Sequence, residues 1–467
     1  MNAFPMLAAA LALLAPPDVT RLLDERASNF SEVAREIWEL AEVGYQEERS
    51  SALLKAQLEA AGFEIQSGVA GMPTAFIGSF GSGRPVIALL AEFDALPGLS
   101  QDAIPDRKPR AENAPGHACG HHLFGTASTA AAIAVQEWLS SSGIPGTIRL
   151  YGTPAEEGGA GKVYMVRAGL FSDVDAVLTW HPADGNDASP VSSLANKSAK
   201  FRFHGLSSHA AAAPERGRSA LDGVEAMNTM VNLMREHVPQ ESRIHYVITR
   251  GGMAPNVVPD FAEVYYYCRH PEVEVVQDLW KRIVLAAEGA AMGTETRMDL
   301  EVIHGIYNKL PNHRLSRLFD ESLRRIGGIE YTSEEIAFAE KLRATLESPE
   351  REIGSQREVQ PFAERVTSAS TDVGDISWLV PTASVQIATW VPGTPAHSWQ
   401  AVAAGGMSIG FKGMVLASKV LATTAVELFS SPSAIEEARR EFEERRGQDF
   451  VYESLVGDRA PPLDYRK

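Results

Sequence analysis

The chain has 467 residues, of which 45% are apolar and 22% charged, and its formal net charge at pH 7 is −17. This composition is ordinary for a soluble globular protein that is long enough for two domains. The acidic balance, without any lysine- or arginine-rich block, excludes nucleic acid and membrane as expected partners.

The N-terminal residues 1–17 include an apolar run from Met6 to Leu14. This run is shorter than the roughly 20 residues that span a bilayer. It resembles the core of a secretory signal, but no lysine or arginine precedes it and no Ala-x-Ala cleavage site follows it. Two cysteines in the whole chain fit a reducing compartment. We therefore expect a cytoplasmic protein, with a periplasmic or secreted location as the alternative if residues 1–17 act as a signal peptide.

From residue 18 onward, apolar residues alternate between helical and strand spacing. Helical spacing covers residues 18–61 with a break at Gly44, and returns at 123–139 and 163–168. Expected strands lie at 63–65, 75–77, 86–91, 147–151, 175–180 and 383–390. Strands that alternate with helices predict a three-layer α/β/α domain, which we place at residues 18–197 and 308–430.

A segment with a different element order interrupts this domain. Strand patterns lie at 200–203, 243–249, 262–268 and 298–303, and helical patterns at 220–236 and 275–290. The order β-α-β-β-α-β predicts a ferredoxin-like insert, which we place at residues 198–307.

The remaining segments are predicted to be helical or to lie at the surface. Residues 333–357 have the charge pattern of a pair of surface helices. Residues 405–428 predict a long alanine-rich helix, and residues 431–467 a charged C-terminal tail at the surface.

A cluster of metal-binding residue types occurs in the segment Gly116-His-Ala-Cys-Gly-His-His122. Further candidates follow other predicted strands, namely Glu156 and Glu157, His181, and His397. Ligands of open α/β sheets gather beyond the carboxyl ends of the strands, so we expect these side chains to meet. They are more than one tetrahedral ion can use, which favours two ions that share a ligand. One of the two adjacent glutamates can then bind metal while the other carries a proton.

The chain resembles the aminoacylase/carboxypeptidase superfamily of dinuclear metallopeptidases, in the Cys-Gly-His branch that includes hippurate and indole-acetyl-amino-acid hydrolases. The resemblance runs from about residue 25 to 430. Its motifs are Pro85-Val-Ile-Ala-Leu-Leu90, Gly116-His-Ala-Cys-Gly-His121, Glu156-Glu-Gly-Gly-Ala-Gly-Lys162, Leu178-Thr-Trp-His-Pro182, Gly217-Arg-Ser-Ala-Leu-Asp222, Ser370-Thr-Asp-Val-Gly-Asp375 and Gly393-Thr-Pro-Ala-His397.

This resemblance implies a metal-dependent amide hydrolase that cleaves N-acyl or N-aroyl amino acids with a metal-bridging hydroxide. It implies two divalent ions per chain, Mn²⁺ or Zn²⁺, with Glu156 as the general base. The implied metal ligands are the bridging Cys119 together with His121, Glu157, His181 and His397.

The resemblance also assigns residues outside the metal ligands. In the insert, which implies a lid and dimerisation domain, His209 corresponds to a catalytic histidine that reaches across a dimer. Asn256 and Arg269 correspond to substrate-binding residues. The dimer partner is a second copy or a paralogous chain. Asp94 matches a carboxylate beside the metals, although Glu92 replaces the histidine ligand that usually lies two residues before it.

His122 departs from the family pattern, because relatives carry Asp or Asn directly after Cys-Gly-His. We expect His122 to orient a neighbouring ligand rather than to bind metal itself. Two other interpretations of the chain stay open. It could be a weakly active or regulatory component of a heteromeric hydrolase, or an amidase in which Cys119 is the nucleophile.

Overall fold

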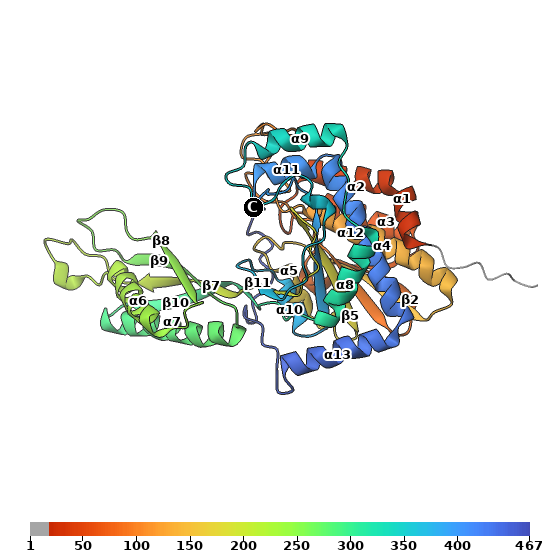
Figure 1. Cartoon of the computed structure of the whole chain (residues 1–467). Coiled ribbons are helices and arrows are strands. Elements are labelled where there is room, and N and C mark those ends of the chain that lie inside the picture. The colour runs from red at the N-terminus through yellow and green to blue at the C-terminus, as the bar shows by residue number, and fades with distance from the viewer. Residues whose placement is uncertain (1–17) are drawn as a thin grey trace, which may run out of the picture.

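The computed structural model describes residues 18–467, so the prediction for residues 1–17 lies outside the described residues. Figure 1 shows a larger domain built around a central sheet and a smaller domain that projects from it. The central sheet has the strand order β1-β2-β4-β3-β5-β12. Its strands are β1 (Glu64–Ser67), β2 (Phe76–Ser82), β3 (Val86–Ala91), β4 (Gly146–Gly152), β5 (Ala176–Ala183) and β12 (Thr382–Ala388).

Strand β3 lies inside the sheet and is buried along its whole length. Ile87, Leu89 and Ala91 belong to the hydrophobic core on one face of the sheet. The alternate residues of the strand, including Ala88 and Leu90, belong to the core on the other face. A continuous apolar run is therefore required here, because successive side chains of a strand point to opposite faces.

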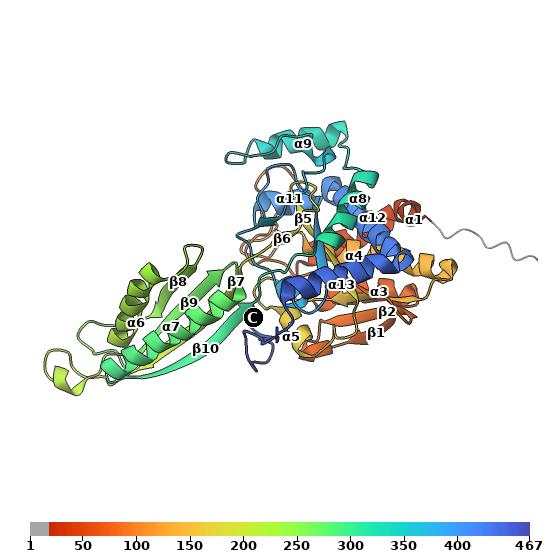
Figure 2. The same ribbon diagram turned by 60° about the horizontal axis from the view of Figure 1, so that its bottom comes forward.

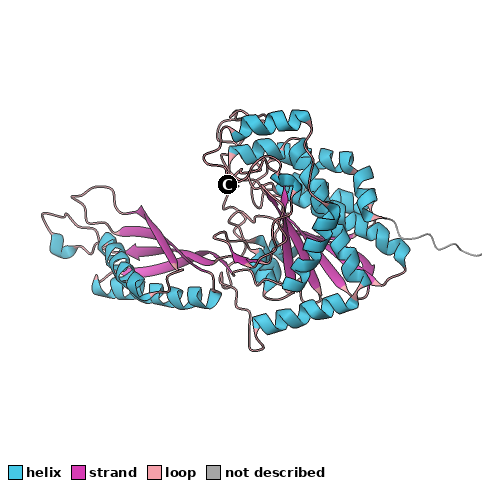
Figure 3. Cartoon of the chain, in the orientation of Figure 1, coloured by secondary structure: helices cyan, strands magenta, loops and turns pink. Residues whose placement is uncertain are grey.

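Helices cover both faces, as Figure 3 shows by colour. The helices that contribute buried side chains to the first core are α1 (Val19–Glu25), α2 (Ala27–Leu40), α3 (Glu48–Ala60), α4 (His121–Ser142), α8 (His313–Ile326), α9 (Ser333–Arg343), α11 (Trp399–Gly405), α12 (Ser408–Ser430) and α13 (Pro432–Arg446). The second core is covered by α5 (Gly161–Arg167), α10 (Val373–Ser377) and the 3-10 turn η1 (Val69–Gly71). The three-layer α/β/α prediction is confirmed.

Helix α12 is long and apolar enough to cross a membrane, but 72% of its most apolar window is buried inside the protein. It packs against α4, α8 and the sheet. These contacts are those of a core helix.

Strands β4, β3, β5 and β12 are mutually parallel, whereas β1 and β2 are antiparallel to their neighbours. The carboxyl ends of the four parallel strands therefore meet at one edge of the sheet. The segments at this edge carry most of the predicted metal ligands.

The smaller domain has a four-stranded antiparallel sheet in the order β10-β7-β9-β8. Its elements, in chain order, are β7 (Ala195–His204), η2 (Pro214–Arg216), α6 (Ala220–Met234), η3 (Arg235–His237), β8 (Arg243–Arg250), β9 (Phe261–His270), α7 (Val273–Gly293) and β10 (Arg297–Ile306). Helices α6 and α7 pack on each other and on this sheet. The order β-α-β-β-α-β is as predicted. Figure 2 shows that this lid domain extends away from the larger domain.

Several segments differ from the sequence predictions. Only the first part of residues 333–357 is an α-helix, α9, and the rest forms turns that include η4 (Ser355–Arg357). The long helix expected over 405–428 is divided into α11 and α12 by a break at Gly406 and Met407. A two-stranded parallel sheet, which was not predicted, pairs β6 (Val191–Ser192) with β11 (Arg365–Val366).

The predicted surface tail also differs from the structure. Residues 432–446 form α13, whose Ala434, Ile435 and Ala438 enter the first core. The segment beyond α13 packs on the protein, and its Leu455 and Val456 are each 3% exposed. The high charge of this sequence concealed these contacts, because long-range packing determines them.

Candidate metal centre

The residues of the predicted metal site come from four places at the carboxyl edge of the sheet. Cys119 precedes α4 by two residues, and His121 is the first residue of that helix. Glu156 and Glu157 lie in the turn between β4 and α5, which we call the glutamate turn (residues 154–160). His181 lies inside β5, near its carboxyl end, and His397 lies between β12 and α11.

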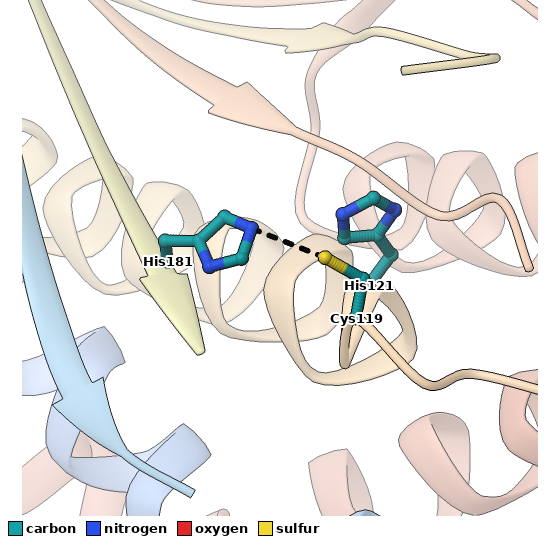
Figure 4. A group of neighbouring side chains, drawn as sticks. All are labelled: Cys119, His121 and His181. Atoms are coloured by element: carbon teal, nitrogen blue, oxygen red, sulfur yellow. Dashed lines mark hydrogen bonds between the residues drawn. The ribbon is translucent and has the colours of Figure 1, made fainter. Parts of the chain in front are cut away.

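The turn that carries Cys119 requires a glycine. Gly120 has φ +75°, and a Cβ atom there would lie 2.7 Å from Cβ of Pro182. This close approach brings Cys119 to β5, where its Sγ lies 3.5 Å from Nε2 of His181. Figure 4 shows Cys119 and His181 facing each other, with His121 beside them.

The candidate donor atoms form three groups, each within 4.8 Å. One group contains Cys119, His121 and His181, and the second contains Cys119, Glu157 and His397. Cys119 thus belongs to both, which places its sulfur between two sets of donors. In the second set, Nε2 of His397 lies 3.1 Å from Oε1 of Glu157.

The third group contains Glu92, His121 and Glu156. Oε2 of Glu92 lies 3.1 Å from Nε2 of His121. From the sequence, Glu92 was noted only as the replacement for a histidine, without a role of its own. Its position two residues before Asp94, at the exit of the buried strand β3, was the available signal.

Glu92 also belongs to a buried ion network that was not predicted from the sequence. Nζ of Lys162 lies 2.7 Å from Oε1 of Glu92 and 2.7 Å from Oδ1 of Asp372. All three side chains are almost completely buried. A buried ammonium group needs such partners, because an unpaired charge in the interior is strongly unfavourable. Asp372 also accepts a hydrogen bond from the Lys162 backbone amide, which fixes the start of α5.

Asp94 holds two parts of the site together. Its Oδ1 lies 2.9 Å from Nδ1 of His121, and its Oδ2 accepts a 2.9 Å hydrogen bond from the backbone amide of Glu157. The first contact fixes the ring orientation of His121, so that Nε2 is directed toward the other donor atoms.

The electrostatics of these residues suit a cation. Burial raises the pKa of the Cys119 thiol, so a thiolate in this position needs a positive charge beside it. Burial lowers the pKa of His181 to about 3, which keeps the imidazole neutral and its lone pair available. Burial also raises the pKa of Glu156 well above the usual range of a carboxyl, and the neighbouring Glu92 and Glu157 add to that shift.

A divalent metal ion fits the donors that are present. Oε2 of Glu92, Nε2 of His121 and Oε1 of Glu157 are buried, and none has a hydrogen-bond partner within residues 18–467. Buried polar atoms usually have a partner, and those that lack one need an explanation. Here they face other donor atoms of the three groups, and a shared cation satisfies them all. Thiolate, imidazole and carboxylate are ligands for Zn²⁺, and imidazole and carboxylate also suit Mn²⁺.

His122 lies beside the site but faces the other way. Its Nε2 lies 3.0 Å from the carbonyl oxygen of Gly405 at the end of α11, and its ring is 4.9 Å from the ring of His117. It is completely buried. His122 thus contacts the helix that follows His397 rather than a donor group directly.

His209 and Asn256 lie together at the distal tip of the lid domain. The His209 backbone pairs with Val257, and the carbonyl oxygen of Asn256 accepts a hydrogen bond from Ala210. Strand β7 leaves the larger domain at Ala195 and reaches this tip after ten residues, roughly 30 Å. The tip is therefore remote from the metal centre of the same chain.

The His209 ring has a defined hydrogen-bonding state. Its Nδ1 accepts hydrogen bonds from the amides of Ala211 and Ala212 at 3.2 and 3.1 Å. Because Nδ1 accepts, Nε2 carries the proton and can donate. Arg269 lies at the opposite, proximal end of the lid sheet, where β9 pairs it with Asn196, and its guanidinium covers the ring of Tyr267 at 5.2 Å.

Comparisons with known proteins agree with this architecture. Residues 194–294 match the model of the M20 peptidase dimerisation domain. The chain is 42% identical over 460 residues to one of the two kinds of chain in the p-aminobenzoyl-glutamate hydrolase of Escherichia coli (strain K12), covering 91% of this chain and 95% of that protein. It is 31% identical to the Xaa-Arg dipeptidase of Mus musculus, covering 93% of each.

Among solved structures, a Bacillus subtilis protein described as a dinuclear metal binding peptidase from the M20 family superposes with a TM-score of 0.60. The sequence identity is 19%, and the match covers 87% of this chain and 99% of that one. At this identity the likeness shows the fold alone.

Proposed function

The chain belongs to the M20 family of metal-dependent amidohydrolases and peptidases, and we propose that it cleaves the amide bond of N-acyl or N-aroyl amino acids of the p-aminobenzoyl-glutamate type. The observation that carries the proposal is the donor cluster in which Cys119 lies within reach of both His121 with His181 and Glu157 with His397. The name of the 42% identical relative supports the substrate class.

We place two divalent ions, Mn²⁺ or Zn²⁺, in this cluster, with Cys119 as the shared ligand. His121 and His181 would complete one set, and Glu157 and His397 the other. When bound, such ions lower the pKa of a water molecule and polarise an amide carbonyl. The dinuclear description of the Bacillus subtilis protein supports the number of ions.

Glu156 is the residue for proton transfer. Its carboxyl group belongs to the donor group of Glu92 and His121, and burial raises its pKa. A carboxylate with a raised pKa takes a proton from water and then releases it to the leaving amine nitrogen more readily than an ordinary one. Glu157, whose carboxylate is directed at His397, remains a ligand.

The lid domain supplies the remaining groups from a partner chain. His209 presents its Nε2–H at a tip that is remote from its own metal centre, and Asn256 lies beside it. Across a dimer, this N–H donates to the oxygen of the scissile carbonyl, and Asn256 holds a polar group of the substrate. Arg269 is a candidate for the substrate carboxylate, because a guanidinium pairs with a carboxylate in a bidentate manner.

The partner is a second copy of this chain or a paralogous chain, and the match to a dimerisation domain supports either. The relative from Escherichia coli is named as one component of a hydrolase, and the other named component of that enzyme is also similar to this chain, which favours a heteromer. In that assembly the complete donor set supports a catalytic role rather than a regulatory one. We also propose a cytoplasmic location, where a reduced Cys119 is maintained.

A nucleophilic role for Cys119 is less favoured. Its nearest imidazoles belong to the same donor groups, and burial raises the thiol pKa. A cysteine nucleophile instead needs a lowered pKa and a base that a third group orients.

A hydrolysis screen tests the proposal. The protein is stripped with a chelator, resupplied with Mn²⁺ or Zn²⁺, and incubated with p-aminobenzoyl-glutamate, N-benzoyl and N-acetyl amino acids, and dipeptides that end in arginine. Release of the free amino acid measures turnover. We expect chelation to abolish hydrolysis and added metal to restore it. Activity that resists the chelator would refute the metal-dependent mechanism, and uniform inactivity toward the acyl and aroyl amino acids would refute the substrate class.

A further inference from the structure

The segment that follows α13, residues 447–467, which we call the C-terminal strap, crosses the junction between the two domains. The hydroxyl of Tyr452 donates a 2.6 Å hydrogen bond to Asp375, and Tyr307 donates to the carbonyl oxygen of Glu453 at 2.9 Å. Further along, Arg459 bonds the carbonyl oxygen of Ile303 in β10 of the lid domain. In Figures 1 and 2 the chain accordingly ends between the two domains.

The last residues of the strap bind the glutamate turn. The hydroxyl of Tyr465 donates to the carbonyl oxygen of Glu157 at 3.0 Å, and Nη2 of Arg466 donates to the same oxygen at 2.7 Å. The amide of Glu157 is held from the other side by Asp94. Both polar groups of the Glu157 backbone therefore have partners, while its carboxylate faces His397.

The larger domain provides a matching seat for the strap. The Tyr465 ring packs edge-on against the ring of Tyr45, with 5.7 Å between centroids and an interplanar angle of 74°. Gln46 donates a 2.9 Å hydrogen bond to the carbonyl oxygen of Leu463. A Cβ atom at Gly44 would overlap the Tyr465 hydroxyl, so a glycine is required there.

The same seat also contacts the glutamate turn directly. The Tyr45 hydroxyl donates to the carbonyl oxygen of Gly159 at 2.8 Å. The buried carboxylate of Glu47 accepts a 2.8 Å hydrogen bond from the amide of Ala155. Tyr45 therefore links the strap to the turn.

The glutamate turn needs such external support. Ala155 and Ala160 have φ values of +58° and +55°, a region that residues with a side chain seldom adopt. Unfavourable backbone angles persist only where the surroundings over-determine them. Two of the surrounding contacts, those of Tyr465 and Arg466, come from the end of the chain.

We propose that Tyr465 and Arg466 are positioning residues of the metal centre. By holding the carbonyl of Glu157 they fix the direction of its carboxylate, and with it the adjacent Glu156. The inference rests on the proposed function, since it gives the turn a metal ligand and a proton carrier. Groups that hold ligands from outside typically change metal affinity or activity about 10- to 100-fold when they are removed.

The test compares point variants of the strap. Tyr465→Phe, Arg466→Met and the double variant remove the hydroxyl and guanidinium donors, and Arg466→Lys keeps a cation. Asp464→Asn and Lys467→Met are matched controls, because both side chains are exposed in the same segment. For each protein, competition with a chromophoric chelator gives the affinity of the metal-free protein for Zn²⁺ and Mn²⁺, and steady-state hydrolysis gives kcat and KM.

We expect the double variant to bind one of its two ions about 10- to 100-fold more weakly and to lose a similar factor in kcat, with a small change in KM. Arg466→Lys should recover part of the affinity, and the controls should match the wild type. A double variant with wild-type metal affinity and kcat would overturn the inference, even if its Tm fell, because the strap would then serve stability alone. If the double variant does not fold, the two single donor variants decide by the same criterion.

The two proposals fail in different ways. A wild-type protein that binds no metal and hydrolyses none of the substrates refutes the proposed function itself. A wild-type protein that binds two ions and hydrolyses substrate, beside strap variants that do the same, refutes only the positioning role.

Discussion

At the scale of single residues, neighbours in the sequence have separate tasks because they point in different directions. Glu156 and Glu157 are adjacent, yet Glu157 faces His397 while Glu156 belongs to the group of Glu92 and His121. His121 and His122 are likewise adjacent, but helix geometry rotates successive side chains by about 100°. One histidine therefore joins the donors and the other contacts α11.

Replacement of Glu156 separates proton transfer from metal binding. Glu156→Gln keeps the size of the side chain but removes its basicity, so kcat should fall by about 10²- to 10⁴-fold. The metal content, measured by mass spectrometry of the purified protein, should stay at the wild-type value. Turnover close to wild type would show that another group carries the proton. Glu48→Gln, at an exposed position of α3, is the control for a neutralised glutamate.

A pair of asparagine variants separates the two histidines. His121→Asn removes a donor shared by two of the three groups, so metal content should fall below that of the wild type. His122→Asn loses the contact with Gly405 and leaves a buried gap, which should cost about 1–3 kcal/mol of unfolding free energy while metal content is retained. Urea unfolding and metal analysis of both variants check this. Metal loss in His122→Asn comparable to that in His121→Asn would contradict the assignment.

At the scale of elements, a buried ion network joins three segments at the edge of the sheet. Glu92 follows β3, Lys162 lies in the first turn of α5, and Asp372 precedes α10. The network pairs the two carboxylates with the one ammonium group, and it places α5 directly after the glutamate turn.

Removal of the central cation should destabilise the protein strongly. Lys162→Met leaves two buried carboxylates without their partner, which typically costs about 3–5 kcal/mol. The free energy of unfolding, measured by urea titration, checks this against Lys55→Met, which changes a partly exposed lysine on α3. A loss below about 1 kcal/mol in Lys162→Met would mean that the carboxylates are protonated or solvated without the lysine.

The same elements show how far the sequence could predict the structure. Periodicity identified the strands of the central sheet and of the lid because both alternate toward hydrophobic cores. The parallel strands then brought Cys119 and His181 together, as the topology rule predicted. The ion network and the strap were missed, because each depends on contacts between residues more than about 60 positions apart, which leave no periodic signal. The residues after 446 were predicted to form a charged tail, although Tyr465 reaches the glutamate turn.

At the scale of the whole molecule, the lid domain separates catalytic groups from their own site. The lid is attached through β7 and β10, and its strand β8 lies at a sheet edge. Large apolar side chains are exposed on α6, on β8 and at the distal tip, including Leu233, Val247 and Val257. Exposed apolar surface of this kind marks protein interfaces. A dimer through the lid would cover it and would bring each tip to another chain.

Complementation between two inactive variants tests whether His209 acts in a partner chain. Glu156→Gln and His209→Ala should each be inactive alone. In a mixed dimer, the chain that keeps Glu156 receives the intact His209 of its partner, so one of the two sites is complete. Random exchange of equal amounts gives half mixed dimers, and the mixture should therefore recover about a quarter of wild-type activity. If His209 served its own chain, every site would lack one group and the mixture would stay inactive. Co-refolding the two variants ensures exchange, and size-exclusion chromatography verifies the dimer. His237→Ala, a lid histidine away from the distal tip, is the control and should remain active alone.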